Sequence, residues 1–172
     1  QPVEIIQPIN IDYSNFKKLS INAKEIKINT KYNAVFSNAN IEDQIKISPI
    51  EVITNLHNKN FDSFGYENKF IINIIDATIS KTEIENSNAK KFEEKIIFKY
   101  EVSFLVEYEL MDDSSFLIAN TTVEISRSTT SPKYISLNER DIIINELLIN
   151  SLKDFTNEAN LQLKIYMNEY LK

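Results

Sequence analysis

Alternation of apolar and polar residues predicts a β-hairpin in the middle of the chain. Between residues 96 and 110 an apolar side chain stands at every second position, which is the spacing of a strand with one buried face. Residues 117–125 alternate in the same way, and the turn-forming sequence Asp-Asp-Ser-Ser at 112–115 separates the two segments. We therefore expect two antiparallel strands joined by a short turn.

Two earlier segments are expected to complete the sheet. Residues 69–84 begin with a run that is apolar at both parities, which is typical of a central strand covered on both sides. Residues 16–30 also alternate, but the apolar parity changes near Lys24 and Glu25. This change predicts a single strand with a β-bulge.

Helix-capping sequences predict where two helices begin. Ser48, Pro49 and Glu51 have the types and spacing of an N-cap serine, a proline at the first helical position and a glutamate at the third. Ser136 and Glu139 form a second capping box, at the head of a long segment with apolar residues three to four positions apart. The chain therefore contains one short helix before residue 65 and one long helix that reaches the C-terminus.

The length of the second helix poses a problem of fit. At 1.5 Å per residue, about 35 residues would span roughly 50 Å, more than a sheet of ordinary strands covers. We expect the helix either to break near residues 157–160 or to project beyond the sheet.

The order of these elements, β-α-β-β-β-α, predicts an α+β fold. We expect a four-stranded mixed sheet with two helices packed on one face, the first strand being reached by a crossover. Residues 1–15 carry two of the four prolines and no sustained period, so they are interpreted as a tether or edge segment. Residues 16–172 are expected to form one domain with a long C-terminal helix.

Composition argues against several functional classes. The single glycine, Gly65, excludes a glycine-rich phosphate loop, which needs several. The absence of cysteine and the single histidine, His57, argue against cysteine chemistry and multi-histidine metal sites. A formal net charge of -6 disfavours nucleic acid as a partner. We therefore predict a non-enzymatic protein without a cofactor.

The few residues that could perform chemistry have simpler structural interpretations. His57 shares a face with apolar residues of the first helix and lacks a partner at motif spacing, so we interpret it as a packing residue. Asp76 interrupts the apolar run of its strand and is either a functional carboxylate or a paired strand residue, the latter being favoured. Asp76, Arg127, Glu139 and Arg140 are predicted to form structural ion pairs, with the two arginines joining a strand end to the start of the second helix.

Five other residues are better candidates for contact with a partner than for catalysis. Glu101, Glu107 and Glu109 alternate with the apolar positions of their strand and so point away from the core, toward solvent or a partner. Tyr166 and Tyr170 lie near the end of the second helix, where apolar residues occupy more than one side. These tyrosines either belong to a docking surface or pack in the core of a curved helix.

Several segments together resemble a known kind of protein. They are Ser48-Pro49-Ile50-Glu51, the hairpin strand 100–110, the strand segment Thr-Val-Glu-Ile-Ser-Arg-Ser at 122–128, and Ser-Leu-Asn-Glu-Arg at 136–140. With the element order, they are similar to alphaproteobacterial outer-membrane lipoproteins of unknown function. The architecture over about residues 16–171 also resembles small periplasmic lipoproteins that assist envelope transport, such as the lipopolysaccharide-assembly partner LptE and the auxiliary lipoproteins of lipid-trafficking transporters.

This resemblance implies a location and a role. It implies a periplasmic domain tethered to the outer membrane, with a non-catalytic accessory role that involves an envelope protein or lipid, and it implies no site residues. Such proteins carry a lipobox cysteine, which this sequence lacks, so the lipid anchor is expected to precede Gln1. The alternative is a carrier of a small apolar ligand, with a cavity between the sheet and the second helix lined by Phe98, Phe104 and Tyr108.

Overall fold

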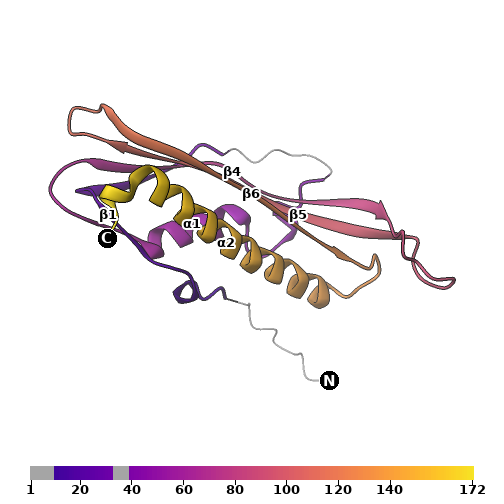
Figure 1. Ribbon diagram of the computed structural model, residues 1–172. Helices are drawn as coiled ribbons and strands as arrows, with labels where there is room; N and C mark the ends of the chain where they lie inside the picture. Colours follow the sequence, from indigo (N-terminus) through magenta and orange to yellow (C-terminus); the bar gives the residue numbers. More distant parts are fainter. Residues whose placement is uncertain (1–9, 33–38) are drawn as a thin grey trace, which may run out of the picture.

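The computed structural model describes residues 10–32 and 39–172 of the chain, and these form a long, twisted sheet with both main helices against one face (Figure 1). The predicted α+β class is confirmed, and a second, smaller parallel sheet accompanies the four-stranded mixed one. The elements in chain order are η1 (Tyr13–Asn15), β1 (Leu19–Asn22), β2 (Glu25–Thr30), η2 (Glu42–Gln44), α1 (Pro49–Asn60), β3 (Phe61–Phe64), β4 (Lys69–Glu85), β5 (Ile96–Met111), β6 (Leu117–Ser131), α2 (Leu137–Met167) and η3 (Asn168–Tyr170).

The large sheet has the strand order β2-β4-β5-β6. β2 lies parallel to β4, which requires the crossover that includes α1, whereas β5 is antiparallel to both of its neighbours. The predicted hairpin is confirmed, and Asp112 stabilises its turn by accepting hydrogen bonds from the backbone N–H groups of Ser114 (2.8 Å) and Phe116 (2.9 Å).

The prediction of one bulged strand over residues 16–30 was wrong. The chain leaves one sheet and enters another at Ala23 and Lys24, because β1 pairs with β3 whereas β2 pairs with β4. Apolar and polar residues alternate within β1 and within β2, and the parity of the apolar positions changes where the chain passes from one sheet to the other. A register shift does occur elsewhere, in β4 between Ile74 and Asp76.

The only glycine of the chain has a structural reason. Gly65 lies in the turn from β3 to β4 with φ of 111°, a conformation that side-chain-bearing residues rarely adopt. A Cβ atom at this position would lie 2.2 Å from Oδ1 of Asn22, at the end of β1. Gly65 does not end the helix, since α1 already stops at Asn60 and β3 intervenes.

Both helices begin where the capping sequences predict. Ser48 Oγ accepts a hydrogen bond from the Glu51 N–H (3.3 Å), and the Glu51 carboxylate accepts one from the Ser48 N–H (3.2 Å), which completes a capping box. At the start of α2, Ser136 Oγ accepts from the Glu139 N–H (3.1 Å).

Neither expectation for the second helix was right, because α2 is continuous and remains on the sheet. Leu163 and Met167 in its last turns are buried. The strands are longer than usual, with 17, 16 and 15 residues in β4, β5 and β6. At about 3.3 Å per residue they span roughly 50 Å, which matches the length of the helix.

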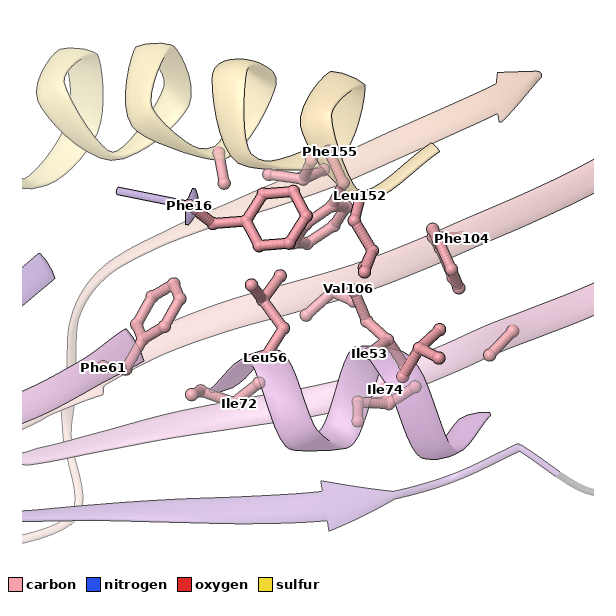
Figure 2. Packing of buried hydrophobic residues seen from close by; sticks show 14 of the residues in the cluster. Phe16, Ile53, Leu56, Phe61, Ile72, Ile74, Phe104, Val106, Leu152 and Phe155 are labelled. Carbon is pink, nitrogen blue, oxygen red and sulfur yellow. The ribbon is translucent and has the colours of Figure 1, made fainter. Parts of the chain in front are cut away.

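The core lies between the two helices and the inner face of the sheet. Figure 2 shows Leu152 and Phe155 of α2 approaching the residues of α1 and of the sheet. The opposite, outer face of the sheet is not covered by α1 or α2 (Figure 1). The expectation that β4 is covered on both sides was therefore wrong: Ile71 is only partly buried and Ile75 is 37% exposed.

Part of the predicted tether packs on the domain. Tyr13 is buried, and the Asn60 side chain at the end of α1 donates hydrogen bonds to the backbone carbonyls of Tyr13 (3.0 Å) and Phe16 (3.1 Å). Residues 1–9 of that predicted segment lie outside the described residues.

Candidate partner-binding surfaces

The alternation of β5 places the three predicted glutamates on the outer sheet face. Tyr108 and Leu110 point into the core with no exposed surface, so Glu107 and Glu109 between and beside them point outward. The register sets Glu107 opposite Asn73 of β4 and Thr122 of β6. The same face carries Asp76 on β4 and Glu124 on β6, one on each side of Leu105.

A buried asparagine holds two of these glutamates in position. Asn73 is only 2% exposed, and its side-chain nitrogen donates to one oxygen of Glu107 (3.1 Å) and one of Glu109 (3.2 Å). Its own side-chain oxygen accepts from Asn29 of β2 (3.2 Å). Three neighbouring strands therefore contribute to one hydrogen-bonded group, which we call the Asn73 cluster: Asn29, Asn73, Glu107 and Glu109.

Glu107 affects the protonation of its neighbour Glu109. The pKa of Glu109 is raised, chiefly because its carboxyl is hydrogen-bonded to Glu107, and further by burial and by repulsion from the Glu107 charge. Lys31 acts in the opposite direction. A basic group arriving from outside would relieve the repulsion, because it would favour the ionised form of both carboxyls.

Carboxylates outnumber lysines on the outer sheet face, where the register also places Lys27, Lys69 and Lys99. Burial raises the pKa of Asp76, and the charge of Glu124 across Leu105 adds to this effect, whereas hydrogen bonds from the Thr78 side chain and the Ala77 backbone oppose it. Glu101, farther along β5, lies 3.8 Å from the ammonium group of Lys99. This face is therefore suited to a partner with basic side chains.

Two of the four residues predicted to form ion pairs, Arg127 and Arg140, do so. Arg127 Nη1 donates to both carboxylate oxygens of Asp154 (3.0 and 2.9 Å), so it joins β6 to the middle of α2 and not to the helix start. Arg140 donates to the Gln44 carbonyl (3.0 Å) and lies 3.6 Å from Asp141. Among the described residues neither Asp76 nor Glu139 has an ion pair; Asp76 is hydrogen-bonded within β4, and the Glu139 backbone is bonded to the helix cap.

The two predicted tyrosines lie on the helix side of the molecule. Tyr166 is 57% exposed, near the end of α2. Tyr170, in η3, is partly buried and lines a surface cavity of about 540 Å³ together with Gly65, Tyr66 and Ile118. The predicted partner-binding residues therefore fall on two separate surfaces, with the glutamates on one face of the sheet and the tyrosines in the layer on the other.

His57 is a buried residue with both ring nitrogens engaged. Nδ1 lies 2.7 Å from the Ile53 carbonyl, which only accepts, so Nδ1 carries the proton. Nε2 must then accept from the Tyr108 hydroxyl at 2.6 Å. Burial lowers the pKa of His57 to about 4 and raises that of Tyr108, so both groups are neutral at ordinary pH.

Two of the three residues predicted to line a cavity for an apolar ligand are packed against other side chains. Phe104 and Tyr108 have no exposed surface. Phe104 packs edge-on against Phe155 of α2, with ring centroids 6.1 Å apart, and Tyr108 stacks on Phe70, with ring centroids 5.5 Å apart. An open cavity of about 710 Å³ borders His57 and Phe61 instead, between α1 and β2. His57 is 1% exposed and offers no free nitrogen to it.

Within residues 10–32 and 39–172 no helix has the length and apolar character needed to cross a membrane. In the same part of the chain no cluster of three or more histidine, aspartate or glutamate residues is arranged to hold a metal ion.

Solved structures with a similar fold include two bacterial lipoproteins. No protein-family model and no curated protein sequence matches the chain. A minor lipoprotein from Acinetobacter baumannii aligns at 10% identity over 87% of this chain and 96% of its own, with a TM-score of 0.45. Rare lipoprotein B from Shewanella oneidensis aligns at 14% identity over 80% of this chain and 94% of its own, with a TM-score of 0.38. Both TM-scores are too low for either likeness to assign a function to this chain.

Proposed function

We propose that this chain is a non-catalytic accessory domain of the bacterial envelope that binds a protein partner through its outer sheet face. The Asn73 cluster carries the proposal, because it fixes two carboxylates side by side on a face that neither α1 nor α2 covers. The periplasmic location and the N-terminal lipid anchor at the outer membrane are part of the proposal and rest on the sequence resemblance.

Preorganisation is the physical reason for assigning binding to this face. A glutamate side chain normally loses rotamer freedom when it pairs with a partner, at a cost of roughly 0.5–1.5 kcal/mol. Asn73 already restricts both Glu107 and Glu109 in the free protein, so part of that loss precedes binding. The fixed pair can then accept charge-assisted hydrogen bonds from an arginine or from two lysines.

Charge favours a protein over an anionic lipid as the partner. Asp76, Glu101, Glu107, Glu109 and Glu124 share the outer sheet face, and a phosphate-bearing headgroup would be repelled by them. We therefore assign this face to a protein partner with a basic surface.

Affinity capture from native envelope fractions tests the proposal. The full-length lipoprotein is compared with the double variant Glu107→Gln/Glu109→Gln, which keeps the shape of the cluster but removes its charge. The matched control is Glu146→Gln/Glu169→Gln, which removes two exposed glutamates from the helix side. Partners are identified after crosslinking, and circular dichroism verifies that all variants fold.

We expect the outer-face variant to lose a specific partner by about tenfold or more, since charged interface pairs contribute roughly 1.5 kcal/mol or above. The control variant should retain it. The proposal fails if both variants capture the same partners equally, or if only the control loses one.

A further inference from the structure

The two edges of the large sheet are treated differently. β2 covers the start of β4 at one edge, and backbone hydrogen bonds continue beyond it from Lys31 to Ile74 (2.9 Å), from Ile41 to Ile79 (3.3 Å) and from Lys81 to Ala39 (2.7 Å). These contacts occupy backbone groups that an edge strand would otherwise expose. This edge is closed over much of its length.

The opposite edge is formed by β6 and is open. β6 has 15 residues and pairs with β5 along almost all of them. In the described part of the chain, residues 117–131 make no backbone–backbone hydrogen bond beyond that pairing. Alternate N–H and C=O groups of an antiparallel edge strand point away from the sheet, and no proline interrupts them before Pro132.

α2 lies over β6 beside this open edge. The Thr121 hydroxyl of β6 donates to the Gln162 side chain of α2 at 3.1 Å. Leu163 and Met167 of the same helix are buried against the sheet. An extended segment added to β6 would place every second side chain on the inner side of the sheet, next to α2.

A second copy of this chain does not fit at the same edge. α2 lies over β6, as its bonds from Thr121 to Gln162 and from Arg127 to Asp154 show. Two β6 strands paired edge to edge would be about 4.8 Å apart. Their two α2 helices would then be brought closer than the about 8–10 Å at which helices pack. The edge therefore fits a lone strand and excludes a symmetric dimer.

We infer that the open edge of β6 is a strand-addition site for an extended segment of a protein partner, with every second side chain on the inner side of the sheet, next to α2. The side chains of the added segment that point to the outer sheet face would lie next to Glu124. It points to the outer sheet face and has no ion pair among the described residues, so a basic side chain opposite it is favoured. This site is distinct from the Asn73 cluster and does not depend on it.

A synthetic peptide is the probe. It has about nine residues with valine at alternate positions, threonine between them and a central lysine, long enough to pair with the middle of β6. Amide hydrogen exchange of the folded domain is followed by NMR with and without the peptide. The control peptide has proline in place of the two central valines, which removes the ability to pair.

With free peptide at about ten times its dissociation constant, we expect exchange within residues 117–131 to slow by about tenfold, and the proline peptide to have no effect. The inference is overturned if protection appears in another strand or nowhere. It is also overturned if the domain without peptide sediments as a dimer with β6 already protected, since that would make a second copy the occupant.

A charge exchange locates the peptide on the edge. Glu124→Lys should weaken binding of the lysine peptide by roughly three- to tenfold and should improve binding of the same peptide with a central glutamate. Glu101→Lys makes the same charge change on the same face in the central strand β5, so it should alter neither affinity. Equal effects of the two variants would contradict pairing at β6.

The two proposals can fail separately. The variant Glu107→Gln/Glu109→Gln should bind the lysine peptide as the unchanged domain does. If it loses the peptide together with the captured partner, strand addition at β6 is wrong and both observations belong to the outer sheet face.

Discussion

The two faces of β5 use polar groups in opposite ways. On the inner face the Tyr108 hydroxyl has one partner, His57, whose second nitrogen is bonded to a backbone carbonyl, so the buried group is neutral and satisfied. On the outer face, one residue away, Glu107 and Glu109 share the same amide of Asn73 and repel each other when both are ionised. The inner arrangement stabilises the fold, whereas the outer one retains an unfavourable charge pair.

This difference separates stability from binding within one strand. A protein selected for stability alone would gain from replacing one glutamate by a neutral residue, because like charges next to each other on a sheet destabilise it. Retaining both is expected where the charges serve a partner. Variants of the two faces should therefore change different measured quantities.

The largest change in the free energy of unfolding is expected from removing a large side chain from the core on the inner face. Phe155 of α2 has no exposed surface and packs against both His57 and Phe104. Phe155→Ala should lower the free energy of unfolding by about 3–5 kcal/mol, measured by urea denaturation, because it leaves a cavity in the layer. The control is Ile165→Ala on the exposed side of the same helix. It should change the free energy of unfolding by less than about 0.5 kcal/mol. Similar losses in both variants would show that α2 is not anchored through Phe155.

Acid should destabilise the inner face through His57. Its pKa in the folded protein is about 4 because of burial, below its usual value of 6.5, so the unfolded chain binds a proton first as the pH falls. The stability contributed by the neutral ring is complete above about pH 6.5 and is lost progressively toward pH 4, by about 3 kcal/mol in total. Urea denaturation across this range measures the loss.

The matched variant for this prediction removes both members of the pair. His57→Phe/Tyr108→Phe replaces two mutually bonded groups by rings and leaves neither unsatisfied. Its stability should fall less between pH 6.5 and pH 4 than that of the unchanged protein, by about the amount attributed to His57. Parallel pH curves for the two proteins would place the acid sensitivity elsewhere.

A smaller effect is expected from the bridge between the helix layer and β6. Arg127 and Asp154 are bonded through both carboxylate oxygens, but their side chains are 44% and 40% exposed. A double-mutant cycle with Arg127→Ala and Asp154→Ala should give a coupling of roughly 0.5–1 kcal/mol, decreasing with salt. The pair Lys99 and Glu101, at 3.8 Å on the outer face, provides the comparison and should give less. Equal couplings would show that the bidentate geometry adds nothing.

The sequence predicts the inner face better than the rest of the fold. Strict alternation over residues 96–110 marks both faces of β5, and the capping serines mark where both helices begin. β3 was not predicted because Phe-Asp-Ser-Phe has no lasting period, and its partner β1 lies some 40 positions earlier in the chain. The course of α2 was mispredicted because the helix was compared with strands of ordinary length, although the pattern over residues 69–84 and 96–110 already predicts long strands.

For the outer sheet face the sequence predicts which side chains point outward, but not which side chains they contact. Parity alone points Glu107 and Glu109 outward, but it does not show what holds them. Asn73 stands in an apolar run and becomes their neighbour only through the register of β4 against β5, which shifts between Ile74 and Asp76. The partner of Arg127 was likewise hidden, because Asp154 lies 27 residues away and is brought near by the packing of α2. Periodicity reports the face of a side chain and not its cross-strand neighbours.

The smallest predicted effect is the most direct test of the contrast between the faces. Because the pKa of Glu109 is raised in the folded protein above its usual value of 4.5, the folded state holds a proton that the unfolded chain has released, and folding is penalised as the pH rises through that window. Glu109→Gln removes the penalty, so it should increase the free energy of unfolding near neutral pH by roughly 0.2–1 kcal/mol. Below about pH 4 the gain should vanish, because the carboxyl is then protonated in both states.

Glu101→Gln is the matched control, since Glu101 lies on the same face of the same strand but beside Lys99. It should bring no gain at neutral pH, because it removes an attraction and not a repulsion. A gain from Glu109→Gln that is the same at every pH would mean that the gain does not come from the raised pKa of Glu109. A loss at neutral pH would mean that Glu109 stabilises the sheet, and the outer face would then have to be counted, like the inner one, as a device for stability.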